Sequence, residues 1–310
     1  MARYLVTGGA GFIGSHLAAA LRKRGDSVRI FDNFATGKRE NLAAAPGAEL
    51  YEGDLRNYKS IREACEGVDY VYHEAALPSV ARSVEDPVTT DDVNVRGTLH
   101  LLMAARDAKV KRVIYAGSSS AYGESPTLPK HEEMPGDPIS PYGVSKFTGE
   151  NYCRSFARVY GLHTVVLRYF NVFGPRQDPS SQYSGVIALF CRAAVEDTVA
   201  TVHGDGLQSR DFTYIDNVVH GNLLAAERDV PPGTVMNCAT GSAITLLDLA
   251  AALGELRKKP IPVVHSAPRA GDIKHSLAEI SRARKILGYE PIVDFKTGLA
   301  RTLEWYRGAL

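Results

Sequence analysis

Several features that would mark a common class of protein are missing from this chain. Basic and acidic residues nearly cancel, with 36 Lys and Arg against 35 Asp and Glu and a net charge of +1. This balance argues against a general nucleic-acid-binding protein, because such proteins usually carry a basic excess. The four cysteines show no CxxC spacing, so neither a metal cluster nor a disulfide framework is indicated.

Long apolar runs are missing as well. No stretch reaches the roughly 18 apolar residues that cross a membrane, and no basic-then-apolar leader opens the sequence. We therefore expect a cytoplasmic protein with reduced, buried cysteines, and with no membrane, nucleic-acid or metal partner.

What is present points to a large folded core. The chain has 310 residues, 45% of them apolar, and short apolar runs alternate with amphipathic stretches through its first half. We expect strands over 4–7, 28–32, 49–54, 70–76, 112–118 and 164–172 and helices over 12–24, 93–108 and 140–160. This alternation predicts an α/β fold with a doubly wound, mostly parallel sheet covered on both faces.

After residue 172 glycine and proline punctuate shorter elements, which predicts a smaller C-terminal α/β lobe. We divide the chain into one domain of residues 1–172 plus about 212–240 and a second of about 173–211 plus 241–310.

A glycine-rich turn joins the first expected strand to the first helix. Gly8, Gly11 and Gly14 follow a GxxGxxG pattern, and Phe12 and Ile13 open the helix. Such glycines allow a tight turn and a close approach to a pyrophosphate, and the helix N-terminus offers free N–H groups to phosphates. A plain glycine turn without a ligand is the alternative.

An acidic residue at the end of the second expected strand favours a dinucleotide. Asp32 stands 18 residues after the last glycine of the turn, where a carboxylate binds ribose hydroxyls and repels a 2′-phosphate. We therefore expect NAD, with NADP as the alternative because Asn33 and Lys38 follow closely. Asp54 and Leu55 are expected to border the adenine, although Asp54 is equally well explained as a turn residue.

A tyrosine, a lysine and a run of serines form the candidate catalytic group. Tyr142 and Lys146 stand four residues apart in the expected helix 140–160 and so share one face. The strand before them ends in Ser118, Ser119 and Ser120, at the sheet edge where ligands bind. A tyrosine of pKa ~10 is about one part in a thousand ionised at pH 7, and a nearby ammonium and a cationic cofactor ring stabilise the phenolate. Two unrelated surface residues at helical spacing are the alternative.

Together these motifs resemble the extended short-chain dehydrogenase/reductase family, and within it nucleotide-sugar 4-epimerases of the UDP-N-acetylglucosamine and UDP-glucose type. The resemblance covers essentially the whole chain, including the stretches 75–80, 168–175, 204–206, 209–212 and 269–272. It implies a Rossmann-like sheet with a smaller C-terminal substrate lobe, tightly bound NAD, a UDP-sugar substrate and a homodimer formed through helices 93–108 and 140–160. It also implies that Tyr142 removes the proton of the sugar 4-hydroxyl while a hydride moves to NAD and later returns to the opposite face.

The resemblance assigns further roles residue by residue. It places the cofactor against Gly8, Gly11, Phe12, Ile13, Gly14, Asp32, Asn33, Asp54, Leu55, Ala75, Ala76, Lys146, Tyr169 and Val172. It places the sugar nucleotide against Ser79, Ser118, Ser119, Ser120, Tyr142, Asn171, Val186, Arg210, Arg269, Asp272 and Ser276. The catalytic residues implied are Ser118, Tyr142 and Lys146. Arg210 and Arg269 suit a diphosphate because guanidinium forks match phosphate oxygens, with surface salt bridges as their alternative.

Ser276 bears on which sugar is accepted. In epimerases of this kind the residue at its position borders the C2 substituent, where a small side chain leaves room for an N-acetyl group and a tyrosine does not. The resemblance therefore implies UDP-GlcNAc and UDP-GalNAc, with UDP-Glc and UDP-Gal beside them. A serine that merely faces solvent is the alternative.

Other functions stay open at this point. A uronate or pentose nucleotide-sugar epimerase is the first of them. A sugar-nucleotide 4,6-dehydratase usually carries Asp-Glu after the catalytic serine, where this chain has Ser119 and Ser120. A net reductase would consume added nicotinamide cofactor, and a non-catalytic NAD-binding sensor typically lacks the tyrosine or the lysine, both of which are present here.

Overall fold

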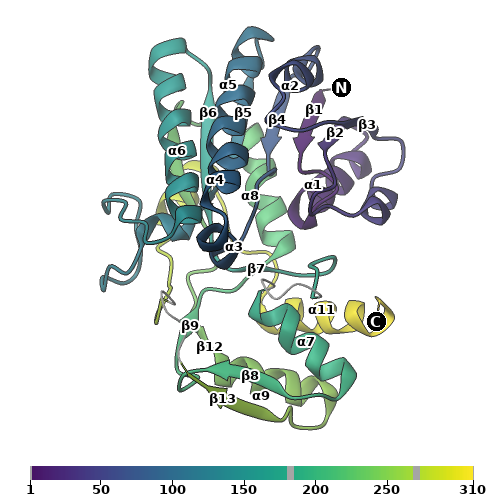
Figure 1. Cartoon of the computed structure of the whole chain (residues 1–310), viewed down its shortest axis with the longest axis vertical. Coiled ribbons are helices and arrows are strands. Elements are labelled where there is room, and N and C mark those ends of the chain that lie inside the picture. Colours follow the sequence, from purple (N-terminus) through teal and green to yellow (C-terminus); the bar gives the residue numbers. More distant parts are fainter. Residues whose placement is uncertain (1, 180–184, 268–272, 310) are drawn as a thin grey trace.

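A seven-stranded parallel sheet forms the centre of the computed structural model, which describes residues 2–179, 185–267 and 273–309 (Figure 1). Its strands lie in the order β11-β6-β5-β4-β1-β2-β3. The chain therefore winds outward from β1 in one direction and from β4 in the other, which confirms the predicted doubly wound fold. The strands are β1 (Arg3–Thr7), β2 (Ser27–Asp32), β3 (Glu49–Glu52), β4 (Tyr70–His73), β5 (Arg112–Ser118), β6 (Thr164–Tyr169) and β11 (Thr234–Cys238).

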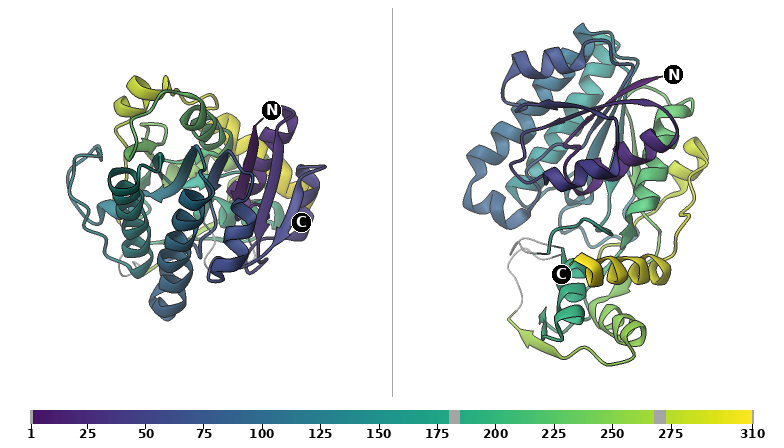
Figure 2. Two further views of the ribbon diagram at one scale, coloured as in Figure 1. Left: turned by 90° about the horizontal axis from the view of Figure 1, so that it is seen from above. Right: turned by 90° about the vertical axis from the view of Figure 1, so that its right-hand side faces the viewer.

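Two apolar cores cover the two faces of this sheet. Successive strand residues alternate between them, so that Val6 and Ile30 face one core while Leu5 and Phe31 face the other. Helices α1 and α8 pack on the first face, and α2, α5 and α6 pack on the second (Figure 2). Their bounds are α1 (Phe12–Lys23), α8 (Ile215–Glu227), α2 (Tyr58–Cys65), α5 (Gly97–Asp107) and α6 (Pro141–Tyr160). Because both faces of the sheet are covered, the inner strands are largely apolar, whereas the edge strand β3 is mostly exposed.

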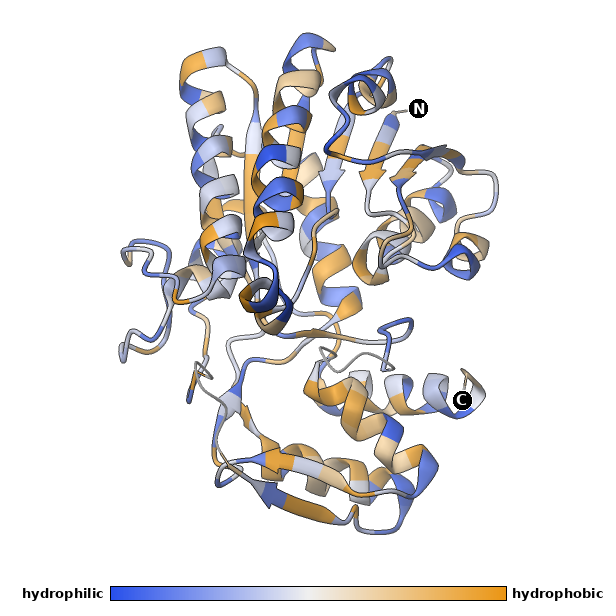
Figure 3. Ribbon diagram, in the orientation of Figure 1, coloured by the Kyte–Doolittle hydropathy of each residue, from blue (hydrophilic) through white to orange (hydrophobic). Residues whose placement is uncertain are grey.

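A smaller lobe lies beyond the carboxyl ends of the strands, below the sheet in Figure 1. Its helices α7 and α9 belong to the same apolar cluster as α1 and α8, and Figure 3 shows hydrophobic residues concentrated on the sheet strands and on α7. Its elements are α7 (Val186–Glu196), β8 (Ala200–His203), β9 (Ser209–Arg210), β12 (Ile244–Thr245), α9 (Leu246–Arg257), β13 (Val263–Ser266) and α11 (Phe295–Ala309). Helix α10 (Ser281–Leu287) lies instead beside the main sheet, against α8 and β11. The division into two domains at the boundaries given above stays a prediction.

Several short helices and strands lie along the chain between these longer elements. They are η1 (Arg39–Ala44), α3 (Val80–Glu85), α4 (Pro87–Asp91), η2 (Asp92–Arg96), η3 (Ser119–Tyr122), β7 (Val172–Phe173) and β10 (Thr213–Tyr214). The strand pairs outside the main sheet are β7 with β10, β9 with β12 and β8 with β13.

The expected strand 164–172 is in fact two strands. β6 ends at Tyr169, Asn171 adopts a φ of +33°, and β7 then pairs with β10 instead of extending the sheet. A positive φ lies outside the extended region, so the strand cannot continue through Asn171. The expected helix 93–108 is also divided, because a π-helical turn, η2, precedes α5. The expected strands 49–54 and 70–76 end earlier, at Glu52 and His73.

A buried ion pair fixes α6 on the sheet. Arg168 of β6 donates from Nη2 to Oε1 of Glu150 at 2.6 Å and from Nε to Oε2 at 2.8 Å. The guanidinium also lies 4.5 Å from the ring centre of Tyr122. Removing one partner of such a buried pair typically costs about 3–5 kcal/mol, because the other charge is left without compensation. The pair therefore holds in place the helix that carries Tyr142 and Lys146.

Candidate active site

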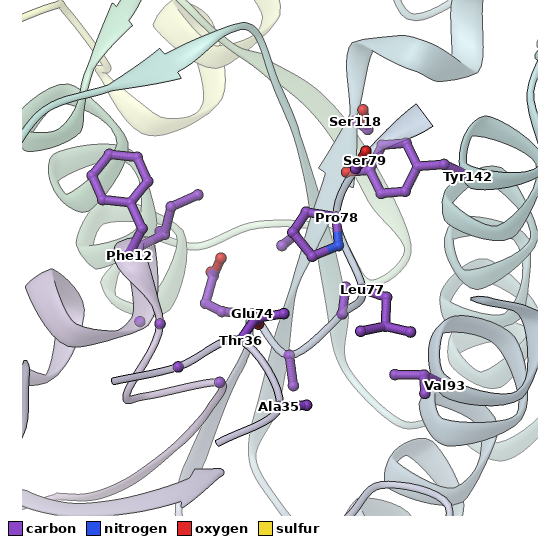
Figure 4. A pocket seen from close by; sticks show the side chains of 18 of the residues that line it. Phe12, Ala35, Thr36, Glu74, Leu77, Pro78, Ser79, Val93, Ser118 and Tyr142 are labelled. Carbon is purple, nitrogen blue, oxygen red and sulfur yellow. The ribbon is translucent and has the colours of Figure 1, made fainter. Parts of the chain in front are cut away.

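One large cavity opens at the carboxyl ends of the strands, toward the smaller lobe, with a volume of about 1070 Å³ (Figure 4). Residues from both halves of the chain line it. The predicted site residues among them are Gly8, Gly11, Phe12, Ile13, Gly14, Asp32, Asn33, Asp54, Leu55, Ala75, Ala76, Ser79, Ser118, Ser119, Ser120, Tyr142, Lys146, Tyr169, Asn171, Val172, Arg210 and Ser276. The fold thus gathers almost the whole predicted set around one space.

Three predicted residues are not in this set. Val186 is the first residue of α7 and packs against the apolar core, whereas its neighbour Gly185 lines the cavity. The structure therefore does not place Val186 at the site. Arg269 and Asp272 lie outside the described residues.

The glycine-rich turn is so close to its neighbours that two of its glycines leave no room for a side chain. Gly8 has a φ of +68°, and a Cβ there would lie 2.8 Å from backbone atoms of Ala75. A Cβ on Gly14 would lie 2.2 Å from the carbonyl oxygen of Gly8. Helix α1 begins directly behind the turn, and its N-cap Gly11 makes no side-chain cap, so the first N–H groups remain available to an anion. This cradle fits the pyrophosphate of a dinucleotide such as NAD.

Asp32 is buried at the end of β2 and is held by the backbone. Its Oδ2 accepts a hydrogen bond from the N–H of Ala10 at 2.9 Å, and its Oδ1 accepts one from Phe34 at 2.8 Å. Burial raises the pKa of Asp32, while these hydrogen bonds lower it. Each carboxylate oxygen keeps a second lone pair, and Asp32 lines the cavity, so its position fits a ribose diol.

Asp54 is both a cavity residue, as expected of a residue that borders the adenine, and a turn residue. It lines the cavity, yet its Oδ1 accepts the N–H of Arg56 at 2.8 Å, as a turn residue does. The Arg56 guanidinium and the Asn33 amide bind its Oδ2 at 2.7 and 2.8 Å. Arg56 is the main cause that lowers the pKa of Asp54 to about 2. Asp54 is therefore ionised and already well partnered beside the site.

The start of α6 sets the position of Tyr142. Ser140 caps the helix by accepting the N–H of Gly143 at 3.1 Å, and Pro141 suits the first helical position. The backbone N–H of Tyr142 donates to Oγ of Ser83, on α3, at 3.0 Å. Two elements therefore locate the tyrosine before any ligand binds.

Lys146 reaches from α6 back to the sheet. Its Nζ donates to the carbonyl oxygen of Ala116, on β5, at 3.0 Å and lies 5.2 Å from the ring centre of Tyr115. Burial lowers the pKa of Lys146, while the negative charge of Glu74 raises it. The ammonium is thus held at the edge of the cavity by the strand that ends in the serine run.

Ser118, the last residue of β5, lies beside Tyr142 in Figure 4. Its Oγ accepts hydrogen bonds from the hydroxyl and the N–H of Ser120 at 2.8 and 3.2 Å. Burial raises the pKa of Tyr142, a hydrogen bond with Ser118 lowers it, and the charge of Glu74 raises it. On balance the polypeptide keeps Tyr142 protonated. The lowering by Lys146 that the sequence led us to expect is not among these causes.

The sequence-based set missed several ionisable groups that line the cavity, with Glu74 among them. Glu74 follows β4 directly and lines the cavity. Its Oε1 accepts a hydrogen bond from the hydroxyl of Tyr169 at 2.8 Å. An acidic residue at the end of a buried strand, just before Ala75 and Ala76, was the signal available for finding it. The cationic residues Arg56, Arg82 and Arg176 and the acidic residues Asp86 and Asp178 also line the cavity and were missed as well.

The lobe side of the cavity carries polar groups suited to a diphosphate and a sugar. Arg210, on β9, donates from Nη1 to the carbonyl oxygen of Ser209 at 2.9 Å. Asn171 lines the cavity at the break between β6 and β7. Ser276 is only 8% exposed, and its N–H donates to the carbonyl oxygen of Ser209 at 3.0 Å. Its burial argues against a serine that merely faces solvent.

Within residues 2–179, 185–267 and 273–309, no three His, Cys, Asp or Glu side chains gather as a metal ion requires. None of the helices in the same ranges combines the length and apolar content needed to cross a membrane.

Known proteins share both the sequence and this architecture. Residues 4–239 match the model of the NAD dependent epimerase/dehydratase family. The UDP-glucose 4-epimerase of Mycolicibacterium smegmatis is 35% identical, over 98% of each chain. The structure of a UDP-glucose 4-epimerase from Thermotoga maritima with UDP-glucose superposes with a TM-score of 0.95 at 38% identity, covering 99% of both chains. That of a UDP-N-acetylglucosamine 4-epimerase from Methanobrevibacter ruminantium, in complex with UDP-N-acetylmuramic acid, also gives 0.95 at 38% identity, covering 100% of this chain and 99% of the other. The chain therefore belongs to the NAD dependent epimerase/dehydratase family, as an NAD-using epimerase of the short-chain dehydrogenase/reductase type.

Proposed function

We propose that this protein interconverts UDP-hexoses that differ at C4, accepting UDP-GlcNAc and UDP-GalNAc together with UDP-Glc and UDP-Gal. The observation that carries the proposal is that one cavity joins the glycine-rich turn to Ser118, Tyr142 and Lys146. Cofactor and sugar nucleotide then share one space, as redox chemistry at a sugar carbon requires.

Three side chains, Ser118, Tyr142 and Lys146, act as the catalytic residues. Tyr142 takes the proton of the sugar 4-hydroxyl and later returns it, and Ser118 bridges the two by hydrogen bonds. Lys146, whose ammonium group donates hydrogen bonds, binds the ribose hydroxyls of the cofactor. When bound, NAD supplies the redox chemistry by accepting a hydride from C4 and returning it. Oxidation and reduction cancel, so the net reaction is an isomerisation.

The remaining residues hold the two ligands. The glycine-rich turn and the start of α1 receive the pyrophosphate of the cofactor, and Asp32 receives a ribose. Arg210 and Asn171 hold the diphosphate of the substrate, with Arg269 as a further partner from outside the described residues. Ser276 borders the C2 substituent and leaves room for an N-acetyl group.

The decisive experiment incubates the purified protein separately with UDP-GlcNAc, UDP-Glc and UDP-glucuronate, with no added cofactor, and resolves the products by chromatography. We expect C4 epimers of the first two. Conversion of UDP-glucuronate alone would move the assignment to a uronate epimerase. Steady consumption of added NADH would indicate a net reductase, and retained NAD without any turnover would indicate a sensor.

Replacing Ser276 with tyrosine tests the choice of sugar. In Ser276→Tyr we expect turnover of UDP-GlcNAc to fall at least about tenfold, because the phenol fills the space beside C2. Turnover of UDP-Glc serves as the internal control and should persist. If both substrates are affected equally, Ser276 does not discriminate at C2.

We further propose that two copies of the chain form a homodimer through α6 and its neighbours. In this region Val88, Val144 and Val159 are between 49% and 73% exposed, and exposed apolar side chains are candidates for contact with a partner. Light scattering should give a mass twice that of a single chain. In Val159→Glu the measured mass should shift toward that of a single chain. A monomeric mass for the unmodified protein would refute the proposal.

A further inference from the structure

Asp211 is a buried acidic residue at a point where the chain passes between the main sheet and the smaller lobe. It follows β9 of the lobe and precedes β10 and α8, and α8 packs on the sheet. Figure 1 shows β9 in the connection between the two parts. Asp211 is 0% exposed, and it is not among the described residues that line the cavity. Any effect on a ligand in the cavity is therefore exerted through other residues.

Both carboxylate oxygens of Asp211 bind donors from two further connections between sheet and lobe. Oδ1 accepts the backbone N–H of Thr240 at 2.9 Å and the hydroxyl of the same residue at 2.6 Å. Oδ2 accepts the N–H of Gly241 at 2.8 Å and that of Ala278 at 3.3 Å. Thr240 and Gly241 lead from β11 of the sheet to β12 of the lobe, and Ala278 leads from the lobe to α10 beside the sheet. The side chain thus binds the chain where it leaves the sheet and where it returns.

All four of these partners donate, which is the pattern that an acceptor-only carboxylate matches. Burial raises the pKa of Asp211, while the hydrogen bonds from Thr240, Ala278 and Gly241 lower it. A buried polar group without partners would be costly, so these hydrogen bonds and the enclosed position of Asp211 depend on each other. The role inferred below rests on the four hydrogen bonds.

A further connection meets the backbone of Asp211. Its carbonyl oxygen accepts a hydrogen bond from Nδ2 of Asn171 at 3.4 Å. The N–H of Thr213, two residues later, donates to the carbonyl oxygen of Asn171 at 3.2 Å. Asn171 is the break at which the chain leaves β6 of the sheet and enters β7. Asp211 therefore joins four connections between sheet and lobe, its own included.

The residues that the proposed function assigns to the substrate stand beside these connections. Arg210 directly precedes Asp211, Asn171 binds its carbonyl oxygen, and Ser276 comes two residues before Ala278. Arg210, Asn171 and Ser276 all line the cavity. The glycine-rich turn, in contrast, belongs to the sheet. The place where Asp211 holds the connections thus decides where the substrate residues lie relative to the cofactor residues.

We propose that Asp211 is a positioning residue, which fixes the lobe to the sheet and so places the residues that bind the diphosphate and the sugar opposite the cofactor. The inference rests on the proposed function, since that function assigns Arg210, Asn171 and Ser276 to the substrate. Asp211 itself contacts no ligand. Retention of NAD does not depend on it, because the glycine-rich turn and Asp32 stand at the ends of β1 and β2.

The test replaces Asp211 with asparagine, which has the same size. The NH2 group of the amide takes the place of one acceptor and faces N–H donors whichever way the amide is turned. We expect the Kd of UDP, measured by calorimetry on the NAD-bound protein, and the KM of UDP-GlcNAc to rise at least about tenfold, because small displacements of positioning residues have effects of this order or larger. NAD retained after gel filtration should be unchanged, and kcat per bound NAD should change by less than KM.

The rise in KM separates positioning from a plain loss of folded protein. If Asp211 only stabilised the fold, fewer molecules would be active, so kcat per total protein would fall while KM and the Kd of UDP stayed the same. That result would overturn the proposal, as would an unchanged KM with full activity.

Asp294→Asn is the matched control. The Asp294 carboxylate also accepts the N–H and the hydroxyl of a threonine, Thr297, at 2.9 and 2.6 Å, but it does so at an exposed position directly before α11. This variant should leave the Kd of UDP and the KM within about twofold, the effect expected of a surface change away from the site. A tenfold rise in both variants would show that the effect is not particular to Asp211.

A second variant covers the case in which Asp211→Asn does not fold. Thr240→Val removes the hydroxyl that donates to Oδ1 and keeps the three backbone donors, so KM should rise about threefold, as the loss of one hydrogen bond allows. An unchanged KM there contradicts the proposal.

Binding of UDP also separates this inference from the proposed function. A protein that binds UDP, binds it more weakly as Asp211→Asn and converts no UDP-sugar would support the role of Asp211 and refute the proposed function. Normal UDP binding in an Asp211→Asn protein that still epimerises would refute the role of Asp211 alone. If the unmodified protein binds no UDP, both are wrong.

Discussion

Tyr142→Phe should reduce epimerase turnover by about 10²–10⁴-fold, the contribution usually made by a positioned acid–base group. The substitution removes a single hydroxyl. The packing of α6 should survive it, because Ser140, Pro141 and Ser83 determine where the helix begins, and none of them contacts the phenol oxygen. Turnover of UDP-GlcNAc and UDP-Glc should fall together, while the amount of NAD that copurifies stays the same. The measurement is kcat for both substrates, with bound NAD quantified after denaturation.

Tyr160→Phe is the matched control for this prediction. Tyr160 is on the same helix but lies at its far end, is 52% exposed and packs against Phe156. Its substitution should leave kcat within about twofold, the effect expected of a surface change away from the site. If Tyr142→Phe keeps near-normal turnover, Tyr142 is not the acid–base group, and the serine run becomes the next candidate.

Gly14→Ala should produce a protein that no longer retains NAD and is less stable. The added Cβ would lie 2.2 Å from the carbonyl oxygen of Gly8 and 2.9 Å from Cα of Gly9. Both contacts are with backbone, so a side-chain rotation cannot relieve them. Overpacking typically costs about 1–3 kcal/mol, and here the strain falls on the turn that receives the pyrophosphate. The measurements are bound NAD after gel filtration and the free energy of unfolding in urea.

Gly308→Ala is the control for the glycine turn. A Cβ at Gly308, near the end of α11, meets nothing within 4 Å, so this substitution should leave NAD retention unchanged and should not lower stability. Full NAD retention in Gly14→Ala would mean that the turn either relaxes freely or does not bind the cofactor. The first possibility would leave stability unaffected, and the second would still leave it reduced, because the clash with the backbone remains.

Local patterns were enough to predict the sheet and the two signature segments of the site. Alternating apolar runs placed six of the seven sheet strands, because strands buried on both faces are apolar along their length. The spacing of Gly8, Gly11 and Gly14 identified the turn, and the four-residue spacing of Tyr142 and Lys146 placed both on one face of a helix. Each of these features depends on residues close together in the chain.

Local patterns failed where a distant contact decides the conformation. Nothing in the stretch 164–172 indicates that Asn171 takes a positive φ, because the break depends on the pairing of β7 with β10, some forty residues later in the chain. The resemblance implied Val186 at the substrate site, whereas the structure shows Val186 packed against the apolar core and its neighbour Gly185 lining the cavity. At Asn171, pairing between distant segments outweighs the local preference.

The sequence by itself determined the fold class, the glycine cradle for a dinucleotide and the Ser-Tyr-Lys candidates, because periodicity and short-range spacing specify them. Only the tertiary structure decided how the site is charged. Glu74, Tyr142 and Lys146 line one cavity because parallel strands end at a common edge of the sheet, and the Tyr169 hydroxyl, itself bound by Asn222, donates a hydrogen bond to Glu74 there. Burial at that edge moves the pKa values of Glu74 and Tyr142 upward and that of Lys146 downward. Desolvation depends on everything packed around a group, so no stretch of sequence could have supplied it.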